Sequence, residues 1–358
     1  MRAVVRRQKQ LVSDEIAEPV PAAGQVLVRA LACGICGSDL HALHHFEHML
    51  DLGRRAGSAS KTDPARDIVF GHEFCAEILD HGPGTSTRLK AGTRVVSMPI
   101  MLAEAGFETV GYSDRYPGGF AERMVLMEPL LLEVPNGLAD DQAAMTEPFA
   151  VGEHAVAQSG IDAQSVALVL GCGPVGLAVI AALKARGFGP VIAADFSPAR
   201  RRVAEIMGAD IVIDPKAESP HGKWRELDVP ATLAEQSIAR MTGRQGRRPI
   251  IFECVGVPGM LQRVIEEAPP GARIVVAGVC METDRIEPFL CISKQLDFRF
   301  VLGYTPEEFA ASLRHIAEGR IDVRPVLTGT VGLDGVAGAF AALANPDEEV
   351  KVVVVPGR

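Results

Sequence analysis

The sequence predicts an α/β protein that combines a doubly wound parallel sheet with a second, β-rich domain. The first observation is residues 166–195, VALVLGCGPVGLAVIAALKARGFGPVIAAD, which have the pattern of a strand, a glycine turn, a helix and a second strand. The second is that helix and strand patterns keep alternating after this stretch. The third is residues 1–32, where strand-like runs flank the proline-rich loop EPVPAAG.

The glycine turn has the spacing of a dinucleotide-binding site. Residues 166–170 form a short apolar run suited to a buried parallel strand, and the glycines follow in G-x-G-x-x-G spacing. The first glycine permits a tight turn, the second lets the backbone approach a pyrophosphate, and the third lets the helix pack close to the strand. We therefore expect the turn to bind a cofactor at the start of the helix, through Gly171, Gly173, Pro174, Val175 and Gly176.

An acidic residue ends the second strand. Asp195 lies about 20 residues beyond the glycines, where a carboxylate accepts hydrogen bonds from the adenosine ribose and repels a 2′-phosphate. This position favours NAD over NADP. The alternatives are a Rossmann-like core that binds no nucleotide and a membrane-spanning helix over residues 166–183. The spanning helix is rejected because three glycines and a proline interrupt it.

Composition and charge narrow the class of protein. A chain of 358 residues with 47% hydrophobic residues can bury a core in each of two domains. The formal net charge of −9 argues against nucleic acid or an anionic membrane as a partner. The segment MRAVVRRQKQLVSDE lacks the apolar stretch of a secretory signal, so a cytoplasmic enzyme is expected. The seven scattered cysteines imply no disulfide framework.

The expected elements follow from the same patterns. In the β-rich domain we expect strands at residues 3–5 and 26–30. After Asp195 we expect helices at 198–207 and 231–241, and strands at 211–214, 250–253, 273–277 and 297–302. The polar segment 216–230, with the only tryptophan, is expected to be a surface excursion. A helix at 306–318 and a strand at 350–355 are expected to belong to the first domain again.

Residues with metal-ligand chemistry precede the glycine turn. The segment CGICGSDLH (33–41) contains a C-x-x-C pair, which suits half of a zinc site or a redox pair, but no second pair completes a four-cysteine site. His72 and Glu73 follow in GHEF, and Glu147 lies shortly before the first strand of the turn. Cysteine, histidine and carboxylate together suit an open metal site. For His72 or Glu147 taken singly, a hydrogen-bonded polar residue is the alternative.

Together these motifs resemble the zinc-dependent medium-chain dehydrogenase/reductase family, the alcohol dehydrogenase superfamily. The matching pieces span nearly the whole chain: GICGSDLH (34–41), GHEF (71–74), GGFAE (118–122), EPFAVGEHAV (147–156), GCGPVG (171–176), Asp195 and VKVVVV (350–355). The resemblance implies a GroES-like catalytic domain of residues 1–147 and 303–358 and an NAD-binding Rossmann domain of residues 148–302. It also implies a homodimer or homotetramer.

The resemblance assigns the metal. Cys36, His72 and Glu147 resemble the catalytic zinc ligands, and Glu73 resembles a carboxylate that lies beside the metal or replaces its water. Many members hold a second, structural zinc in a lobe with four cysteines. The corresponding stretch, SMPIMLAEAGFETVGYS (97–113), has none, so one zinc per chain is expected. The glutamate of the EP motif resembles the sorbitol, threonine and butanediol dehydrogenase branch.

The resemblance also implies how a proton and the cofactor are handled. Ser38 would take the proton of the alcohol, and His41 would pass it through the cofactor ribose toward solvent, since histidine titrates near neutral pH. Asp39 would orient His72. Lys351 matches a basic residue that contacts the cofactor pyrophosphate, with an ordinary solvated lysine as the alternative.

The substrate is less well defined. Polyol-oxidising relatives carry an Arg-Tyr pair where this chain has Gly303 and Tyr304. The missing arginine favours an apolar or bulky secondary alcohol, or its ketone. A polyol, diol or threonine dehydrogenase is the alternative on the same scaffold, and a non-catalytic NAD-binding sensor is the alternative from another class. Apolar residues expected near the cleft are Phe46, Met49, Leu50, Met101, Leu102, Phe107, Phe120, Phe149 and Met281.

Residues 44–66 are longer than the family's usual link between the two zinc motifs. Their histidines, His44, His45 and His48, could bind a metal, but a surface helix turn is favoured because no second motif supplies further ligands. The apolar residues at positions 46, 49 and 50 could form a lip over the zinc cleft or attach the insertion to its domain.

Overall fold

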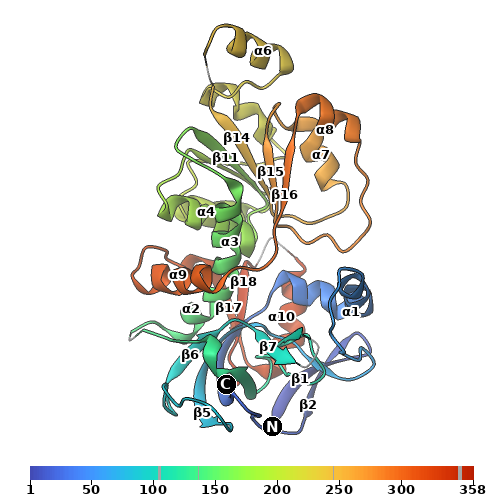
Figure 1. The fold of residues 1–358 in the computed structure, drawn as a ribbon, viewed down its shortest axis with the longest axis vertical. Coiled ribbons are helices and arrows are strands. Elements are labelled where there is room, and N and C mark those ends of the chain that lie inside the picture. The colour runs from blue at the N-terminus through green and yellow to red at the C-terminus, as the bar shows by residue number, and fades with distance from the viewer. Residues whose placement is uncertain (104–105, 136, 245, 346–348) are drawn as a thin grey trace. The chain divides into compact units, whose positions relative to one another are not determined.

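The computed structural model describes residues 1–103, 106–135, 137–244, 246–345 and 349–358, and the chain divides into two compact units (Figure 1). The first unit comprises Met1–Glu147, Phe309–Gly319 and Val326–Arg358, and the second comprises Pro148–Glu308 and Arg320–Pro325. The sequence predicted a second domain boundary at 302/303, and the compact units divide at 308/309. Residues up to Glu308 stay with the second unit because the Glu308 carboxylate lies 2.8 Å from His154 Nδ1.

The second unit is built on a six-stranded parallel sheet, which confirms the predicted α/β class. In spatial order its strands are β13 (Ile211–Ile213), β12 (Val191–Ala194), β11 (Ser165–Leu170), β14 (Arg248–Glu253), β15 (Arg273–Val276) and β16 (Asp297–Phe300). This is the 3-2-1-4-5-6 order of a dinucleotide-binding fold. Such an order leaves a crevice at the carboxyl ends of the central strands, where ligands of this class of sheet bind.

The second unit also contains helices. They are α3 (Thr146–Ser159), α4 (Pro174–Ala185), α5 (Pro198–Ile206), α6 (Leu233–Met241), α7 (Met260–Glu267) and α8 (Pro288–Lys294), with α9 (Pro306–Ala317) crossing to the first unit. Helix α4 lies on one side of the sheet, and α7 and α8 lie on the other (Figure 1). Every residue of β11 is buried, as expected for a strand covered on both faces.

The segment 216–230 is not only the surface excursion that the sequence predicted. It forms two short 3-10 helices, η2 (Pro220–Lys223) and η3 (Arg225–Leu227). Trp224, between them, is 1% exposed and belongs to the hydrophobic core of the sheet. Its indole nitrogen donates a hydrogen bond to His221 Nδ1 at 3.3 Å. Because the segment is mostly polar, its sequence did not indicate that the Trp224 side chain would be part of the core.

The first unit is rich in β-structure. Its main sheet has the order β10 (Leu131–Glu133), β6 (Arg94–Ser97), β5 (Glu73–His81), β3 (Gln25–Gly34), β18 (Lys351–Val354) and β17 (Leu327–Val331), and β9 (Arg123–Met127) also pairs with β3. A second sheet contains β2 (Gln10–Glu15), β1 (Arg2–Arg7) and β4 (Ile68–Val69), and β7 (Ile100–Ala103) pairs with β8 (Gly106–Thr109). Because β18 pairs with β3, residues near position 351 lie beside residues near position 34.

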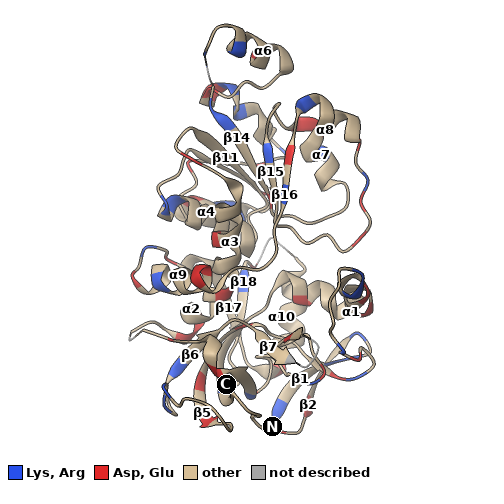
Figure 2. Ribbon diagram, in the orientation of Figure 1, with Lys and Arg blue, Asp and Glu red and all other residues tan. Residues whose placement is uncertain are grey.

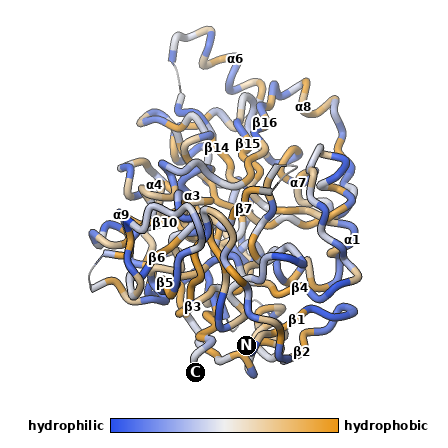
Figure 3. Tube along the Cα trace, turned by 60° about the horizontal axis from the view of Figure 1, so that its bottom comes forward, coloured by the Kyte–Doolittle hydropathy of each residue, from blue (hydrophilic) through white to orange (hydrophobic). Residues whose placement is uncertain are grey.

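Helices and short turns complete this unit. They are α1 (Gly37–Arg55), α2 (Asp140–Ala144), α10 (Val336–Leu343), η1 (Glu128–Leu130), η4 (Arg324–Val326) and η5 (Leu333–Gly335). Apolar residues of the strands, α1 and α10 form one core. Hydrophobic and hydrophilic residues alternate along the chain (Figure 3). Basic and acidic residues occur on elements of both units (Figure 2). Within the described ranges, no helix has both the length and the apolar character needed to cross a bilayer.

Helix α1 contains the first half of the insertion at residues 44–66. Phe46 is fully buried, with its ring 6.1 Å from Phe70 and 6.5 Å from Tyr112. Met49 and Leu50 also pack against the core, whereas the helix histidines His44, His45 and His48 are exposed. Burial of Phe46 supports attachment to the domain and does not support a lip over the zinc cleft.

Candidate active site

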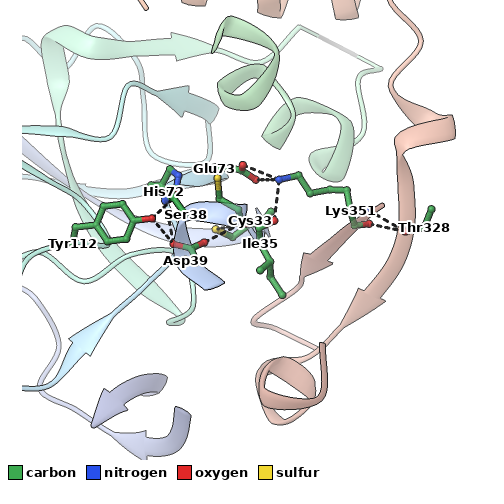
Figure 4. Close-up of polar contacts among 11 residues, drawn as sticks. Cys33, Ile35, Ser38, Asp39, His72, Glu73, Tyr112, Thr328 and Lys351 are labelled. Carbon is green, nitrogen blue, oxygen red and sulfur yellow. Dashed lines mark hydrogen bonds and ion pairs between the residues drawn. The ribbon is translucent and has the colours of Figure 1, made fainter. Parts of the chain in front are cut away.

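Three side chains with metal-ligand chemistry meet in the first unit (Figure 4). Cys36 directly precedes α1, His72 directly precedes β5, and Glu73 is the first residue of β5. The pairing of β3 with β5 places Gly34 opposite Glu73, so Cys36, two residues further along, reaches His72. The ligand atoms of Cys36, His72 and Glu73 all lie within 4.8 Å of one another.

This group has the donors that zinc binds, and its spacing, within 4.8 Å, is close to that of a zinc site. A zinc ion lies about 2.0–2.3 Å from its sulfur, nitrogen and oxygen ligands, so two ligands of one ion are at most about 4.5 Å apart. Burial lowers the pKa of His72, but the charge of Asp39 and the contact with Cys36 outweigh it and hold that pKa well above its ordinary value. A metal ion needs the neutral imidazole, so binding here would release a proton.

Asp39 lies beneath the group and is fully buried. Its Oδ2 atom accepts a hydrogen bond from the Cys36 backbone N–H at 3.0 Å. Its Oδ1 atom lies 3.4 Å from His72 Nδ1, which is within ion-pair range but outside hydrogen-bond geometry. Carboxylates in this position commonly orient a ligating histidine, so the geometry supports the role that the resemblance implied for Asp39.

Ser38 and His41 lie one turn apart at the start of α1. Ser38 is half-buried, and its hydroxyl lies 2.8 Å from the Tyr112 hydroxyl. His41 is exposed. Desolvation and the neighbouring His45 lower the pKa of His41 from its ordinary value. Neutral His41 is therefore available to accept a proton over a wider range of pH.

Tyr112 is a site residue that the sequence analysis missed. Its hydroxyl lies 2.8 Å from Ser38 Oγ and 2.9 Å from Asp39 Oδ1, and its ring centroid lies 5.0 Å from that of His72. Burial and the negative charges of Asp39 and Cys36 raise the pKa of Tyr112 well above its ordinary value, so the phenol stays protonated. Nothing in the segment VGYSD marks this tyrosine, because its partners lie 73 and 74 positions away.

Glu73 forms a buried ion pair with Lys351 (Figure 4). Lys351 Nζ donates to Glu73 at 2.5 and 2.7 Å and to the Ile35 carbonyl at 2.9 Å, and both charged side chains are fully buried. Burial lowers the pKa of Lys351, but the charge of Glu73 outweighs it and the net shift is upward. The solvated lysine considered from the sequence is therefore wrong. In this structure all three N–H donors of Lys351 Nζ are engaged by Glu73 and Ile35. Contact of Lys351 with the cofactor pyrophosphate stays a prediction.

Glu147 is not one of the three residues that form the metal group. It lies in the first turn of α3 and is 8% exposed. Among the described residues, the cluster of ligand atoms contains Glu73 and does not contain Glu147. The negative charge of Glu147 nevertheless contributes to the raised pKa of Lys351. The structure thus brings together two of the three expected ligands, Cys36 and His72, with the carboxylate that was expected beside them.

The glycine turn follows β11 in the second unit. Gly171 has a φ of 88°, a conformation that other residues rarely adopt. A Cβ atom at Gly176 would lie 1.8 Å from the Gly171 carbonyl oxygen, so only glycine permits this approach of helix α4 to the turn. Gly173 precedes the helix, Pro174 is its first residue and Val175 follows. The first backbone N–H groups of α4 are thus available to an anion at the turn.

Asp195 lies directly beyond β12 and faces the same turn. Its Oδ2 atom accepts the Cys172 backbone N–H at 2.7 Å, and Oδ1 accepts the Ser197 backbone N–H at 2.8 Å. Each carboxylate oxygen can accept a second hydrogen bond, so ribose hydroxyls can still bind there. The two backbone contacts hold the carboxylate at the position where the sequence predicted a cofactor ligand.

Arg200 is a second residue that the sequence analysis missed. A Cβ atom built on Gly173 would lie 3.9 Å from Arg200 Nη1, so the guanidinium borders the turn. Its Nε atom is buried and has no hydrogen-bond partner among the described residues. In sequence it belongs to the run ARRR, which has the composition of an ordinary helix surface. Its position one turn into α5 is the signal that could have identified it.

Most of the apolar residues expected near the cleft have another role. Phe46, Met101 and Phe120 are fully buried in the core of the first unit. Leu102 and Phe107, on the β7–β8 pair, are instead 65% and 62% exposed. Alignment by motif spacing identified hydrophobic residues but could not separate core positions from surface positions. An apolar pocket built from this set is therefore not supported.

The architecture and the Cys-His-Glu group together define a class, the zinc-binding dehydrogenases with a GroES-like domain. Residues 22–136 match the family model described as alcohol dehydrogenase GroES-like domain, and residues 174–318 match the model described as zinc-binding dehydrogenase. The chain belongs to the zinc-type medium-chain alcohol dehydrogenase family, and it is an oxidoreductase that acts on CH–OH groups.

Individual relatives agree with this assignment. The chain is 32% identical to an (R,R)-butanediol dehydrogenase of Bacillus subtilis, over 98% of this chain and 97% of that protein. It is 27% identical to a sorbitol dehydrogenase of the same organism, over 99% and 97%. A crystal structure of 2R,3R-butanediol dehydrogenase from Bacillus subtilis matches with a TM-score of 0.78 and 30% identity, covering 99% of both chains. A zinc-binding dehydrogenase from Sinorhizobium meliloti bound to NADP matches with a TM-score of 0.79 and 25% identity, over 99% of both chains.

Proposed function

We propose that this chain is a zinc- and NAD-dependent dehydrogenase that interconverts a secondary alcohol and its ketone. The observation that carries the proposal is the convergence of Cys36, His72 and Glu73 next to the Ser38 hydroxyl network. Cys36, His72 and one of the two glutamates, Glu73 or Glu147, would hold a single zinc ion. When bound, zinc supplies a Lewis acid that lowers the pKa of a hydroxyl group, as it lowers that of water from about 15.7 to about 7.

The protein's own residues would handle the proton. Ser38 accepts the hydroxyl proton of the alcohol, and its half-buried hydroxyl is accessible to a substrate. His41, exposed one turn further along α1, releases the proton to solvent. Asp39 holds His72 and the Cys36 backbone in position. These groups together remove the proton that otherwise opposes loss of hydride from the alcohol carbon.

The second unit would hold the cofactor that accepts the hydride. Backbone N–H groups of the turn from Gly171 to Gly176 face the pyrophosphate. Asp195 accepts the ribose hydroxyls and repels a 2′-phosphate, which supports NAD. Arg200 offers a guanidinium with an unsatisfied Nε at the same turn and would donate to the adenosine ribose or its phosphate. One structural neighbour binds NADP, so the NAD preference needs a direct comparison of the two cofactors.

The substrate proposed first is an apolar or bulky secondary alcohol, in keeping with the absence of the arginine before Tyr304. A small vicinal diol is the second candidate. It is favoured by two relatives named (R,R)-butanediol dehydrogenase, at 32% and 28% identity over 98% and 96% of this chain. The burial of Phe46, Met101 and Phe120 in the core also weakens the argument for a wide apolar pocket.

The deciding experiment is reduction of NAD or NADP by the purified protein across apolar secondary alcohols, 2,3-butanediol stereoisomers, sorbitol and threonine. Turnover of apolar alcohols with NAD would support the first proposal. Turnover confined to diols would select the second candidate. Zinc analysis of the same sample should give one equivalent per chain. Two equivalents, or full activity after zinc removal, would contradict the proposed site.

We also propose that the chain forms a homodimer through the second unit. Strand β16 is an edge strand of the sheet. Phe300 is its last residue and Leu302 lies two residues beyond it, and their side chains are 65% and 87% exposed. Unpaired sheet edges with exposed apolar residues favour association. A Phe300→Asp/Leu302→Asp variant should therefore be monomeric in light scattering, and Ile206→Asp, an equally exposed apolar position on α5, should not change the mass. A monomeric parent protein would contradict the proposal.

A further inference from the structure

The Tyr112 hydroxyl is shared between two residues of the proposed site. It lies 2.8 Å from Ser38 Oγ and 2.9 Å from Asp39 Oδ1 (Figure 4). We propose that Tyr112 is a positioning residue that fixes the Ser38 hydroxyl as a proton acceptor for the substrate. The inference rests on the proposed function, because it assumes that Ser38 takes the proton of the alcohol.

The direction of the Ser38 hydroxyl follows from the donors available. A phenol has one proton, and it has two oxygen neighbours here. Asp39, as a carboxylate, can only accept, and its Oδ2 atom already accepts from the Cys36 backbone. Tyr112 is the donor in both contacts, so its one proton is shared between Ser38 Oγ and Asp39 Oδ1. With one lone pair of Ser38 Oγ occupied by the bond from Tyr112, the other lone pair is left for a substrate hydroxyl, and the proton of Ser38 itself stays free to be passed toward His41.

Packing fixes the phenol ring from three sides. Its centroid lies 5.8 Å from Phe70 in an edge contact, 6.5 Å from Phe46 and 5.0 Å from the His72 ring. Phe46 and Phe70 are fully buried. A ring held in this way cannot swing its hydroxyl away from Ser38 without disturbing the core, since cores are close-packed. The orientation of Ser38 is therefore built in before the substrate arrives.

The same arrangement links the proton acceptor to the metal group. Asp39 contacts Tyr112 through Oδ1, and the same oxygen lies 3.4 Å from His72 Nδ1. Tyr112 thus contacts the residue that accepts the proton and the residue that orients a zinc ligand. Removal of the phenol oxygen could act through either contact, so the test must separate an effect on Ser38 from an effect on zinc binding.

The test is a double-mutant cycle between Tyr112→Phe and Ser38→Ala. Phenylalanine keeps the ring and its contacts and removes only the hydroxyl. We expect Tyr112→Phe to lower kcat about 10-fold in the parent protein, the size of one lost hydrogen bond, with KM little changed. On the Ser38→Ala background we expect a further loss of less than about twofold, because the group through which Tyr112 acts is absent. An equal loss on both backgrounds, or none in the parent, would overturn the proposal.

Two further measurements do not depend on turnover alone. Zinc content should stay at the parent value in Tyr112→Phe, and zinc loss would show that the tyrosine serves His72 and Asp39 instead. The solvent deuterium isotope effect on kcat should increase in Tyr112→Phe, because proton transfer to a disordered Ser38 becomes more rate-limiting. An unchanged isotope effect together with a lower melting temperature would indicate a merely structural role and overturn the proposal.

Tyr116→Phe is the matched control. Tyr116 is partly buried in the same core, and its ring contacts Arg115 instead of the site. It should leave kcat, zinc content and isotope effect unchanged. Failure of the proposed function has a different signature: if Ser38→Ala alone keeps the parent rate, Ser38 is not the proton acceptor, and the assignment of Tyr112 is overturned with it. If Ser38→Ala slows turnover but Tyr112→Phe does not, only the inference on Tyr112 is overturned.

Discussion

The metal group of the first unit and the glycine turn of the second are assembled over very different distances along the chain. In the turn, Cys172 contacts Asp195 across 23 positions, and the intervening residues form one strand-helix-strand unit. In and around the metal group, Ser38 contacts Tyr112, 74 positions away in the sequence, and Glu73 contacts Lys351, 278 positions away. Cofactor contacts thus depend on one local segment, whereas the residues for proton and metal chemistry depend on how distant strands pair. A substitution that disrupts the metal group should therefore leave the cofactor turn intact, and a substitution in the turn should leave the metal group intact.

The largest effect expected is loss of the metal. Cys36→Ala should reduce zinc from one equivalent per chain to none and lower kcat/KM by at least about 10³-fold, because Lewis-acid stabilisation is worth several kcal/mol. NADH binding, followed by fluorescence, should be unchanged if the two sites are independent. Cys33→Ala is the control, since Cys33 is buried three residues earlier, outside the metal group. A loss of NADH affinity in Cys36→Ala would show that the metal group and the glycine turn are not independent.

The long-range ion pair should have the largest effect on stability. Lys351→Met leaves Glu73 buried without its cation and should lower the free energy of unfolding of the first unit by about 3–5 kcal/mol. The Glu73→Gln/Lys351→Met double variant should recover most of this loss, because no charge is then buried alone. Hydrogen exchange of amides in β3 and β5 measures the effect locally. Equal protection in the single and double variants would contradict it.

An intermediate effect is expected on the choice of cofactor. Asp195→Ser removes the charge that repels a 2′-phosphate, and the ratio of kcat/KM for NAD to that for NADP should fall about 100-fold, the size of one like-charge contact. Zinc content should not change. An unaltered ratio would show that Asp195 serves only the backbone N–H groups of Cys172 and Ser197.

The smallest effect expected is at Arg200. Arg200→Ala should raise the KM for NAD about 10-fold, the size of one hydrogen bond to a polar ligand, with kcat and zinc content unchanged. Arg202→Ala, an exposed arginine of the same helix, is the matched control and should have no effect. If both variants raise the KM for NAD equally, the positive charge of α5 acts only through general attraction of the cofactor, and a specific contact of Arg200 with the cofactor is contradicted.

The sequence predicted the fold of the second unit well, because the residues that specify this fold lie close together in the sequence. The glycine spacing, the apolar strand and Asp195 are all contained within residues 166–195, and the alternation after them predicted the doubly wound sheet, whose strand order only the structure gives. Trp224 was misplaced because burial of one side chain in a polar segment has no periodic signature. Arg200 was missed because three consecutive arginines give no hint of which one faces the turn.

The metal group was predicted only through the resemblance, and only in part. Cys36, His72 and Glu73 lie together as expected, but whether Glu73 or Glu147 completes the metal site stays a prediction. Lys351 was taken as either a cofactor contact or a solvated residue, because its burial depends on β18 lying beside β3. Tyr112 carries no motif at all. Each of these depends on strand pairing between segments that are remote in sequence, which single-sequence patterns do not encode.

The pairing of β18 with β3 also sets a time order during synthesis on the ribosome. The segment that contains Cys36, His72 and Glu73 emerges early, and the whole second unit is translated before Lys351 appears. Until then the main sheet lacks a strand between β3 and β17, and burial of Glu73 has no cation to offset its desolvation. Nascent chains therefore complete the nucleotide-binding sheet before the metal group. Zinc would be acquired by a protein whose cofactor domain is already folded.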